Sequence, residues 1–173
     1  MLRFGLATIL ALAFPLASAR QAQAQPSVTQ DTLRQMSQAE LDAVYEAAEP
    51  GQIPDGDSQG TAVFFPGTLL NTPSQMLAAL VWQGKVFDTK DGMLINKVFG
   101  FRAIRAEVYL GESLLDGQRS IIIDYAKTSV LAHRIRDEIR EVSPGLYLGR
   151  AYLRTWLGDY MVVNFILNFN GAS

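Results

Sequence analysis

The sequence predicts a mainly β protein, in which one or two short helices precede an antiparallel β-barrel. From Trp82 onward, short apolar segments are separated by turn dipeptides such as Asp91-Gly92 and Asp116-Gly117. Asp-Gly between apolar segments is typical of β-hairpins, because both central turn residues need positive φ. Within the segments, apolar and polar residues alternate with the period of two of a half-buried strand. Roughly seven or eight such strands form a sandwich or a barrel, and a closed barrel leaves no exposed edge.

Residues 1–24 have the order of features of a secretory signal peptide. Arg3 precedes an apolar segment over residues 4–13, and small-residue sites of the A-x-A type end at Ala19 and Ala24. The apolar segment is too short to cross about 30 Å of hydrocarbon, so it does not predict a membrane anchor. We therefore expect an exported protein, periplasmic or secreted, with cleavage after Ala19 or Ala24.

Composition and charge exclude several classes of function. Without residues 1–24 the chain keeps 13 basic and 17 acidic residues, a net charge of −4, which gives no electrostatic case for a nucleic-acid partner. The chain has no cysteine, which excludes a disulfide framework, a thiol nucleophile and cysteine-ligated metal. About 150 remaining residues suit one domain, which we expect over 37–173. After the N-terminus, no segment predicts a membrane-spanning helix.

The helices are predicted near the start of the domain. Residues 25–36 are polar and weakly patterned, which predicts a flexible lead-in. Ser37 and Glu40 form a capping-box pattern, and Pro50-Gly51 ends the run that follows. The apolar residues of this run fall at helical spacing: Leu41, Val44, Tyr45 and Ala48. Thr72 followed by Pro73 predicts a second short helix up to Trp82.

The glycine-rich segment between the two predicted helices resembles a binding loop only superficially. It lacks the Gly-Lys-Ser/Thr of a phosphate loop, and Asp55 and Asp57 lack the later glutamate of a calcium loop. We interpret it as a turn that leads into a strand over residues 61–65. Further strands are predicted over 81–88, 93–101, 102–110, 119–126, 146–156 and 160–169.

The charged segment 135–149 fits two structures. Its apolar residues have helical spacing, but a helix would stack Arg136 on Arg140, which is unfavourable. As a strand, Arg136, Glu138 and Arg140 alternate in sign along one face, and residues 143–145 form a turn. Spacing favours a helix, whereas charge order and the turn favour a hairpin with solvated charges at a barrel edge.

Four segments together resemble a family of uncharacterised bacterial proteins related to small lipocalin-like domains named for a G-x-W-x-G motif. They are "IPDGDSQG", "WQGKVFD", "SIIIDYAKTS" and "RDEIREVSPGLYLG", in that order. The resemblance covers residues 50–155, and Trp82, Gly84, Lys85 and Phe87 fit its W-x-G-K-x-F strand. The first tryptophan of the G-x-W-x-G motif has no counterpart before Ile53. The resemblance implies a calycin-like β-barrel in which 136–149 is a hairpin.

Catalytic and metal sites of common types are not indicated. His133 is the one histidine, which makes a zinc site improbable, and we predict no metal and no cofactor. There is no G-x-S-x-G elbow, so a triad of Ser120 or Ser129 with His133 and Asp124 has little support. We interpret His133 as a partly exposed turn residue and assign no catalytic residue.

Two groups of charged residues remain as candidates. Asp124, Tyr125 and Lys127 follow an apolar strand, where the mouth of a barrel would be. One interpretation is that they are acid-base residues. The alternative is that Asp124 forms an ion pair with a basic residue at the rim. If 135–142 is a strand, Asp137 points inward between Ile135 and Ile139 and needs a cationic partner. We expect that partner among three arginines, Arg105, Arg119 and Arg150.

The leading hypothesis is that the barrel binds a small apolar or amphipathic molecule, because aromatic residues are frequent in its strands. The alternatives are an acid-base enzyme at the barrel mouth or a structural envelope protein. A membrane-spanning barrel is disfavoured by the charge of 102–110 and 135–142. The residues assigned to the ligand site combine rings and charges: Trp82, Lys85, Tyr109, Asp124, Tyr125, Lys127, Asp137, Arg140 and Tyr147.

Overall fold

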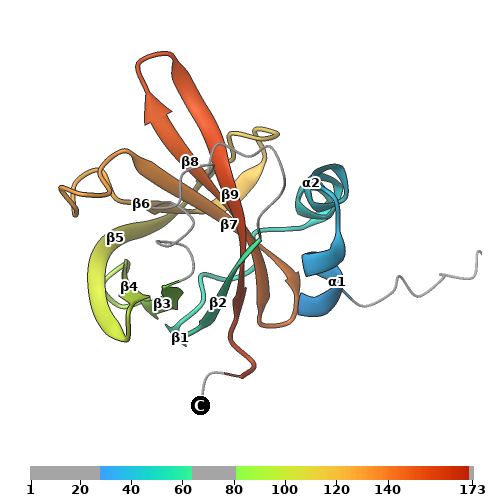
Figure 1. Cartoon of the computed structure of the whole chain (residues 1–173), viewed down its shortest axis with the longest axis horizontal. Coiled ribbons are helices and arrows are strands. Elements are labelled where there is room, and N and C mark those ends of the chain that lie inside the picture. The colour runs from blue at the N-terminus through green and yellow to red at the C-terminus, as the bar shows by residue number, and fades with distance from the viewer. Residues whose placement is uncertain (1–27, 64–80, 172–173) are drawn as a thin grey trace, which may run out of the picture.

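Antiparallel strands form one sheet that curls into a nearly closed barrel, as the sequence predicts (Figure 1). The computed structural model describes residues 28–63 and 81–171. The signal peptide, the helix predicted from Thr72 and the end of the 61–65 strand lie largely outside these residues. The helices are α1 (Gln30–Gln35) and α2 (Gln38–Ala47). The strands are β1 (Gly56–Asp57), β2 (Gln59–Val63), β3 (Trp82–Asp88), β4 (Met93–Val98), β5 (Phe101–Glu112), β6 (Arg119–Asp124), β7 (Ile135–Ser143), β8 (Leu146–Thr155) and β9 (Gly158–Asn168).

A short bent segment closes the barrel. From β3 to β9 each strand pairs with the next in sequence, and β1 and β2 cover the two remaining edges, β1 on β3 and β2 on β9. Ser58 lies at the bend, where its N–H and its Oγ both donate to the Lys85 carbonyl at 2.9 and 2.8 Å. Gly60 lies against Gly84, where a Cβ on Gly60 would come within 2.6 Å of the Gly84 Cα. Side chains on these two residues would therefore prevent closure.

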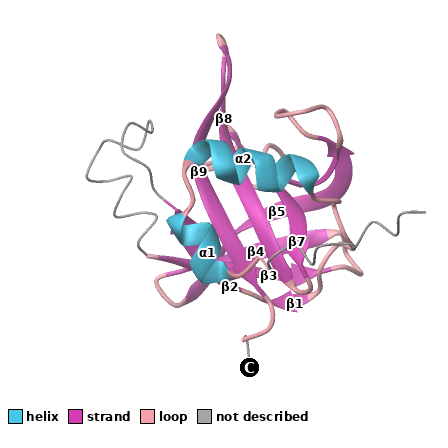
Figure 2. Ribbon diagram, turned by 90° about the vertical axis from the view of Figure 1, so that its right-hand side faces the viewer, coloured by secondary structure: helices cyan, strands magenta, loops and turns pink. Residues whose placement is uncertain are grey.

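The helices cover one outer face of the barrel (Figure 2). The capping box predicted for α2 is confirmed, because Ser37 and Glu40 bond to each other's backbone N–H groups. The prediction of a flexible lead-in is wrong for Gln30–Gln35, which form α1 with Thr29 as N-cap. The helix carries one fully buried apolar residue, Leu33, and one such residue makes no periodic pattern.

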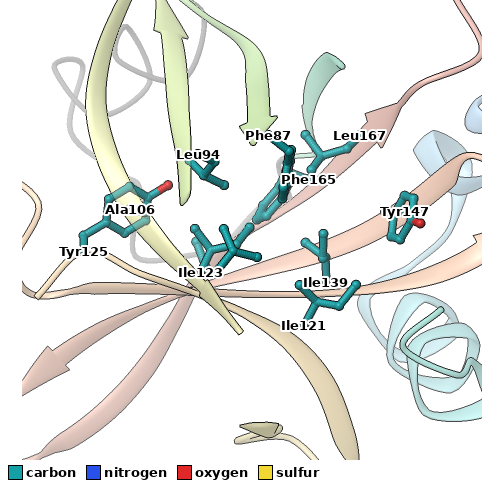
Figure 3. Close-up of a cluster of buried hydrophobic side chains, with 12 residues drawn as sticks. Phe87, Leu94, Ala106, Ile121, Ile123, Tyr125, Ile139, Tyr147, Phe165 and Leu167 are labelled. Atoms are coloured by element: carbon teal, nitrogen blue, oxygen red, sulfur yellow. The ribbon is translucent and has the colours of Figure 1, made fainter. Parts of the chain in front are cut away.

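Two apolar cores lie on the two sides of the sheet. The inner core lies inside the barrel, and Figure 3 shows its side chains converging from strands around the wall. The outer core lies between the helices and the barrel and includes Leu33, Leu41 and Tyr45 from the helices and Leu148 and Ile166 from the strands. Within the described parts of the chain, neither helix has the length and hydropathy needed to cross a bilayer.

Segment 135–149 is a hairpin, which confirms the interpretation from charge order and corrects the one from spacing. β7 and β8 meet at Pro144-Gly145, where Gly145 adopts φ 69°. The expectation that the charges of β7 are solvated is wrong for Glu138 and Arg140, which are buried. They are buried because α2 and the β5–β6 connection cover this outer face of the strand.

Candidate functional site

Four polar side chains meet inside the barrel around the amino group of Lys85. Lys85 Nζ donates to Asp137 Oδ2 at 2.8 Å, to Asn96 Oδ1 at 2.8 Å and to Tyr125 Oη at 2.6 Å. Tyr125 Oη in turn donates to Asp137 Oδ2 at 3.0 Å. All four residues are at most 5% exposed. We call these four residues the lysine cluster.

Strand register positions the lysine cluster. Lys85 on β3 pairs with Asn96 on β4, Tyr125 directly follows β6, and Asp137 lies on β7 opposite Ile123. A register shift between Trp82 and Gly84 lets Trp82 and Lys85, three residues apart, both approach the inner core. Trp82 Nε1 consequently donates to Asn96 Oδ1 at 3.1 Å.

Backbone strain accompanies the cluster at Ile104 on β5. Its φ is 62°, a region that β-branched residues rarely adopt, and the β4–β5 register shifts beside it. The Ile104 carbonyl accepts a hydrogen bond from Asn96 Nδ2 at 2.9 Å. Such a conformation costs about 1–3 kcal/mol and persists only where its surroundings enforce it, as they often do at functional sites.

Aromatic rings enclose the Lys85 amino group. Nζ lies 5.3 Å from the ring centroids of Trp82 and Tyr125 and 5.4 Å from that of Phe165. Phe165 packs edge-on against Trp82 and covers Gly149, where a Cβ would come within 2.3 Å of the phenylalanine ring. The Trp82 and Phe165 rings attract the ammonium group, whereas Tyr125 contacts it through its hydroxyl.

Burial governs the electrostatics of the cluster. It lowers the pKa of the Lys85 amino group, a shift that the Asp137 carboxylate opposes by favouring the ammonium form. Burial, followed by the negative charge of Asp137, raises the pKa of Tyr125 well above its ordinary value. In the cluster the Lys85 amino group lies 2.8 Å from the Asp137 carboxyl group and the Tyr125 hydroxyl is hydrogen-bonded to both, a geometry in which a proton can pass between the three residues.

Four of the residues predicted for a ligand site are brought together here: Trp82, Lys85, Tyr125 and Asp137. Asp137 points inward, as predicted from its place between Ile135 and Ile139. The prediction that an arginine pairs with it is wrong, because Lys85 is its partner.

The other predicted residues lie elsewhere. Tyr147 is inside the barrel but away from the cluster; its hydroxyl donates to the Gln52 carbonyl at 2.9 Å, and burial raises its pKa to about 12. Tyr109 and Lys127 are exposed, so they do not converge with Tyr125 in one cleft. Lys127 pairs with Glu107 at 3.3 Å.

Asp124 forms an ion pair outside the lysine cluster. Arg154 donates to both carboxylate oxygens of Asp124 at 3.0 and 2.8 Å, and Tyr109 Oη donates to Oδ2 at 3.1 Å. The interpretation of Asp124 as half of an ion pair is confirmed, with Arg154 as the base. His133 is exposed, and its Nδ1 lies 2.7 Å from the Val130 carbonyl oxygen.

Arg140 belongs to a second polar cluster, between the barrel and α2. Its guanidinium donates to both oxygens of Asp116 at 2.7 Å and to the Tyr45 carbonyl at 2.9 Å. Nearby, Glu138 accepts from Ser113 Oγ at 2.6 Å and from the Leu114 N–H at 2.9 Å. Each of these charges has a partner, and the Tyr45 contact fastens α2 to the barrel.

A groove on the outside of the barrel has a different character. It measures about 590 Å³ and lies between α1, α2 and the end of β7, with Met36, Val44 and Val142 among its mostly apolar lining. No residue predicted for the ligand site lines it. In the described ranges 28–63 and 81–171, no three His, Cys, Asp or Glu side chains gather in a way that could hold a metal ion.

Sequence reasoning did not assign Asn96, Ile104 or Phe165 to the ligand site. Asn96 had one usable signal, because it is polar and yet shares the inward phase of its strand with Leu94. The strain at Ile104 has no sequence signal, since isoleucine does not favour positive φ. The position of Phe165 over Gly149 depends on pairing between strands and appears only in the structure.

Comparisons with known proteins support the fold. Protein-family models give no match, and neither do curated proteins. Among solved structures, the crystal structure of a protein from Thermomonospora curvata matches with a TM-score of 0.52 at 18% identity, over 77% of this chain and 87% of that protein. Similarity at this level of identity concerns the fold alone.

Proposed function

We propose that the protein binds a small amphipathic molecule inside the barrel, with the polar end of the molecule at the lysine cluster. The observation that carries this proposal is the fully buried Lys85–Asp137 pair in an otherwise apolar interior. A buried ion pair is often less stabilising than apolar side chains of the same volume. Its presence beside a strained Ile104 therefore favours a role in recognition over a role in stability.

The chemistry of the cluster suggests the class of ligand. A carbonyl or carboxylate oxygen of the ligand would take the place of Asn96 Oδ1 as acceptor of one Lys85 N–H. Trp82 and Phe165 offer ring faces for an apolar body. A small-molecule site usually has a mostly apolar lining with a few polar groups. A fatty acid or an aromatic carboxylic acid combines both features.

Export and a relationship to lipocalin-like domains are part of this proposal. The order of features in residues 1–24 supports export to the periplasm or the medium, and a ligand-binding barrel suits that relationship. The mass of the protein purified from its own cells tests export. We expect a chain that begins at Arg20 or Gln25, and a chain that retains residues 1–19 contradicts this part.

Tryptophan fluorescence tests ligand binding directly. The chain has two tryptophans, and Trp156 is exposed, so Trp156→Phe leaves Trp82 as the reporter inside the barrel. We expect saturable quenching of Trp82 by a long-chain fatty acid that carries a quenching group. Lys85→Met should weaken binding at least about tenfold, as loss of a charge-assisted hydrogen bond predicts. Lys127→Met is the matched control, because Lys127 is exposed and outside the cluster.

Two results would contradict ligand binding. One is a folded Trp156→Phe protein whose Trp82 emission does not respond to any of a panel of fatty acids and aromatic acids. The other is equal binding by Lys85→Met and Lys127→Met, which would place the ligand away from the cluster. Native mass spectrometry of protein from its own cells provides a second measurement, in which a bound small molecule appears as added mass.

A second candidate function is acid-base catalysis on a carbonyl compound. It is favoured by the lowered pKa of Lys85 together with the 2.6 Å hydrogen bond to Tyr125. The test is deuterium uptake next to the carbonyl group of a bound ligand in D₂O, followed by mass spectrometry. Uptake that Tyr125→Phe abolishes while binding persists would support catalysis, and absence of uptake in a bound ligand would exclude it.

A further inference from the structure

Large apolar side chains are exposed on three connections of the barrel. The β8–β9 turn exposes Trp156 and Leu157, at 89% and 65%. The β6–β7 connection and the β4–β5 turn each add a pair: Val130 and Leu131, and Phe99 and Phe101. Because β3 to β9 pair in sequence order and run antiparallel, every second connection lies at the same end of the barrel. Among the described residues, three connections lie at this end, residues 99–101, 125–134 and 156–157, and we call them the apolar rim.

Hydrogen bonds tie the β6–β7 connection to the neighbouring strands. The Arg154 N–H donates to the Arg134 carbonyl, and Arg134 Nε donates back to the Arg154 carbonyl, both at 2.8 Å. Thr128 Oγ1 donates to the Arg105 carbonyl at 2.6 Å, which links the β6–β7 connection to β5. Figure 1 shows the β8–β9 hairpin and the β6–β7 connection both projecting away from the helices. The β6–β7 connection is therefore held against β8 and β5.

The opposite end of the barrel has another composition. Its connections are residues 89–92, 113–118 and 144–145, and of their large apolar side chains Leu114 alone is among the exposed ones. On and beside these connections acids outnumber bases, with Asp88, Asp91, Glu112 and Asp116 against Lys90 and Arg119. Within two residues of the apolar rim the bases are in excess, with Lys97, Arg102, Lys127, Arg134, Arg136 and Arg154 against Asp124 and Asp159.

We propose that the apolar rim docks on an anionic lipid surface. Tryptophan favours the membrane interface, and leucine and phenylalanine beside it enter the outer part of the acyl region. Arginine and lysine around them bind lipid phosphates, and the acidic opposite end orients the barrel in the same sense. This inference does not depend on the proposed ligand.

Vesicle flotation tests the inference. The protein is purified from its own cells, with its first residue determined by mass spectrometry, and mixed with vesicles of phosphatidylcholine alone or with one quarter phosphatidylglycerol. We expect binding to the anionic vesicles that weakens with added salt, and little binding to the neutral ones. Trp156→Ser and Leu131→Ser should each lower the partition coefficient about tenfold or more, since each removes an inserting side chain.

A matched control variant distinguishes vesicle binding through the apolar rim from nonspecific hydrophobic adsorption. Leu114→Ser changes an exposed leucine at the opposite end, so its vesicle binding should equal that of the unchanged protein. Equal binding by Trp156→Ser and Leu114→Ser, or no binding to anionic vesicles, overturns the proposal. So does sedimentation that shows a dimer in the unchanged protein and a monomer in Trp156→Ser, because the rim would then contact a second copy.

Discussion

Replacement of Lys85 by methionine is the sharpest test of the buried cluster. Methionine keeps most of the side-chain volume but removes the charge and the three hydrogen bonds of Nζ. Asp137, only 4% exposed, then keeps a buried charge without its cation. Removal of one partner from a buried ion pair costs about 3–5 kcal/mol of unfolding free energy. That is a large part of the roughly 5–15 kcal/mol by which domains are stable.

The double variant Lys85→Met/Asp137→Asn identifies the origin of this loss. An asparagine at 137 carries no charge and can still accept the hydrogen bond from Tyr125, so we expect the double variant to recover most of the lost stability. Urea unfolding followed by circular dichroism measures all three proteins, provided that the slope with urea stays unchanged.

Two outcomes would refute the reasoning. If Lys85→Met loses less than about 1 kcal/mol, Asp137 is not an uncompensated buried charge in that variant. If the double variant is no more stable than the single one, the two residues are not energetically coupled.

Three further predictions concern other parts of the molecule. Gly149→Ala should lower the free energy of unfolding by about 1–3 kcal/mol in urea unfolding, because its Cβ would lie 2.3 Å from the Phe165 ring. Leu33→Ala should cost about 2–4 kcal/mol by the same measurement if α1 belongs to the outer core, whereas a flexible lead-in predicts no change. Above pH 10 the free energy of unfolding should fall, because the pKa values of Tyr45 and Tyr125 are raised in the folded state. The stability that these two tyrosines contribute is complete below the unfolded pKa of 10.0 and is lost as the pH rises toward the folded values. The lowered pKa of Lys85 makes stability rise with pH just below 10.5, which opposes the effect of the tyrosines. Absorbance at 295 nm measures tyrosine ionisation, which should occur together with loss of circular dichroism.

The sequence was most informative where one local rule decides the structure. Asp116-Gly117 and Pro144-Gly145 mark hairpin turns by conformational preference alone, and both hairpins are present. The inward direction of Asp137 follows from strand periodicity once β7 is a strand. The capping box at Ser37 needs no more than four residues, and it too is confirmed.

Features that depend on distant pairing were beyond the sequence. Lys85 was not identified as the partner of Asp137, because the register shift beside Gly84 is not encoded in a strand pattern. Arg140 looked like a solvated charge, because no local signal shows that α2 packs over β7. The length of α1 gives too few residues for an apolar period, so its membership of the outer core required the structure.

The bend at Ser58 has a consequence for how the barrel forms and opens. Each pair from β3 to β9 joins neighbours in sequence, so this part can assemble as a series of local hairpins. The closing segment must instead pair Gly56 with Phe87 and Gln59 with Asn168, and the second of these closes residues 59–168 into one loop. Closure is therefore expected to be the last step of folding. Since β1 holds β3 by only two residues, the same seam should also open first, and its amides should exchange with solvent faster than those of β7 and β8.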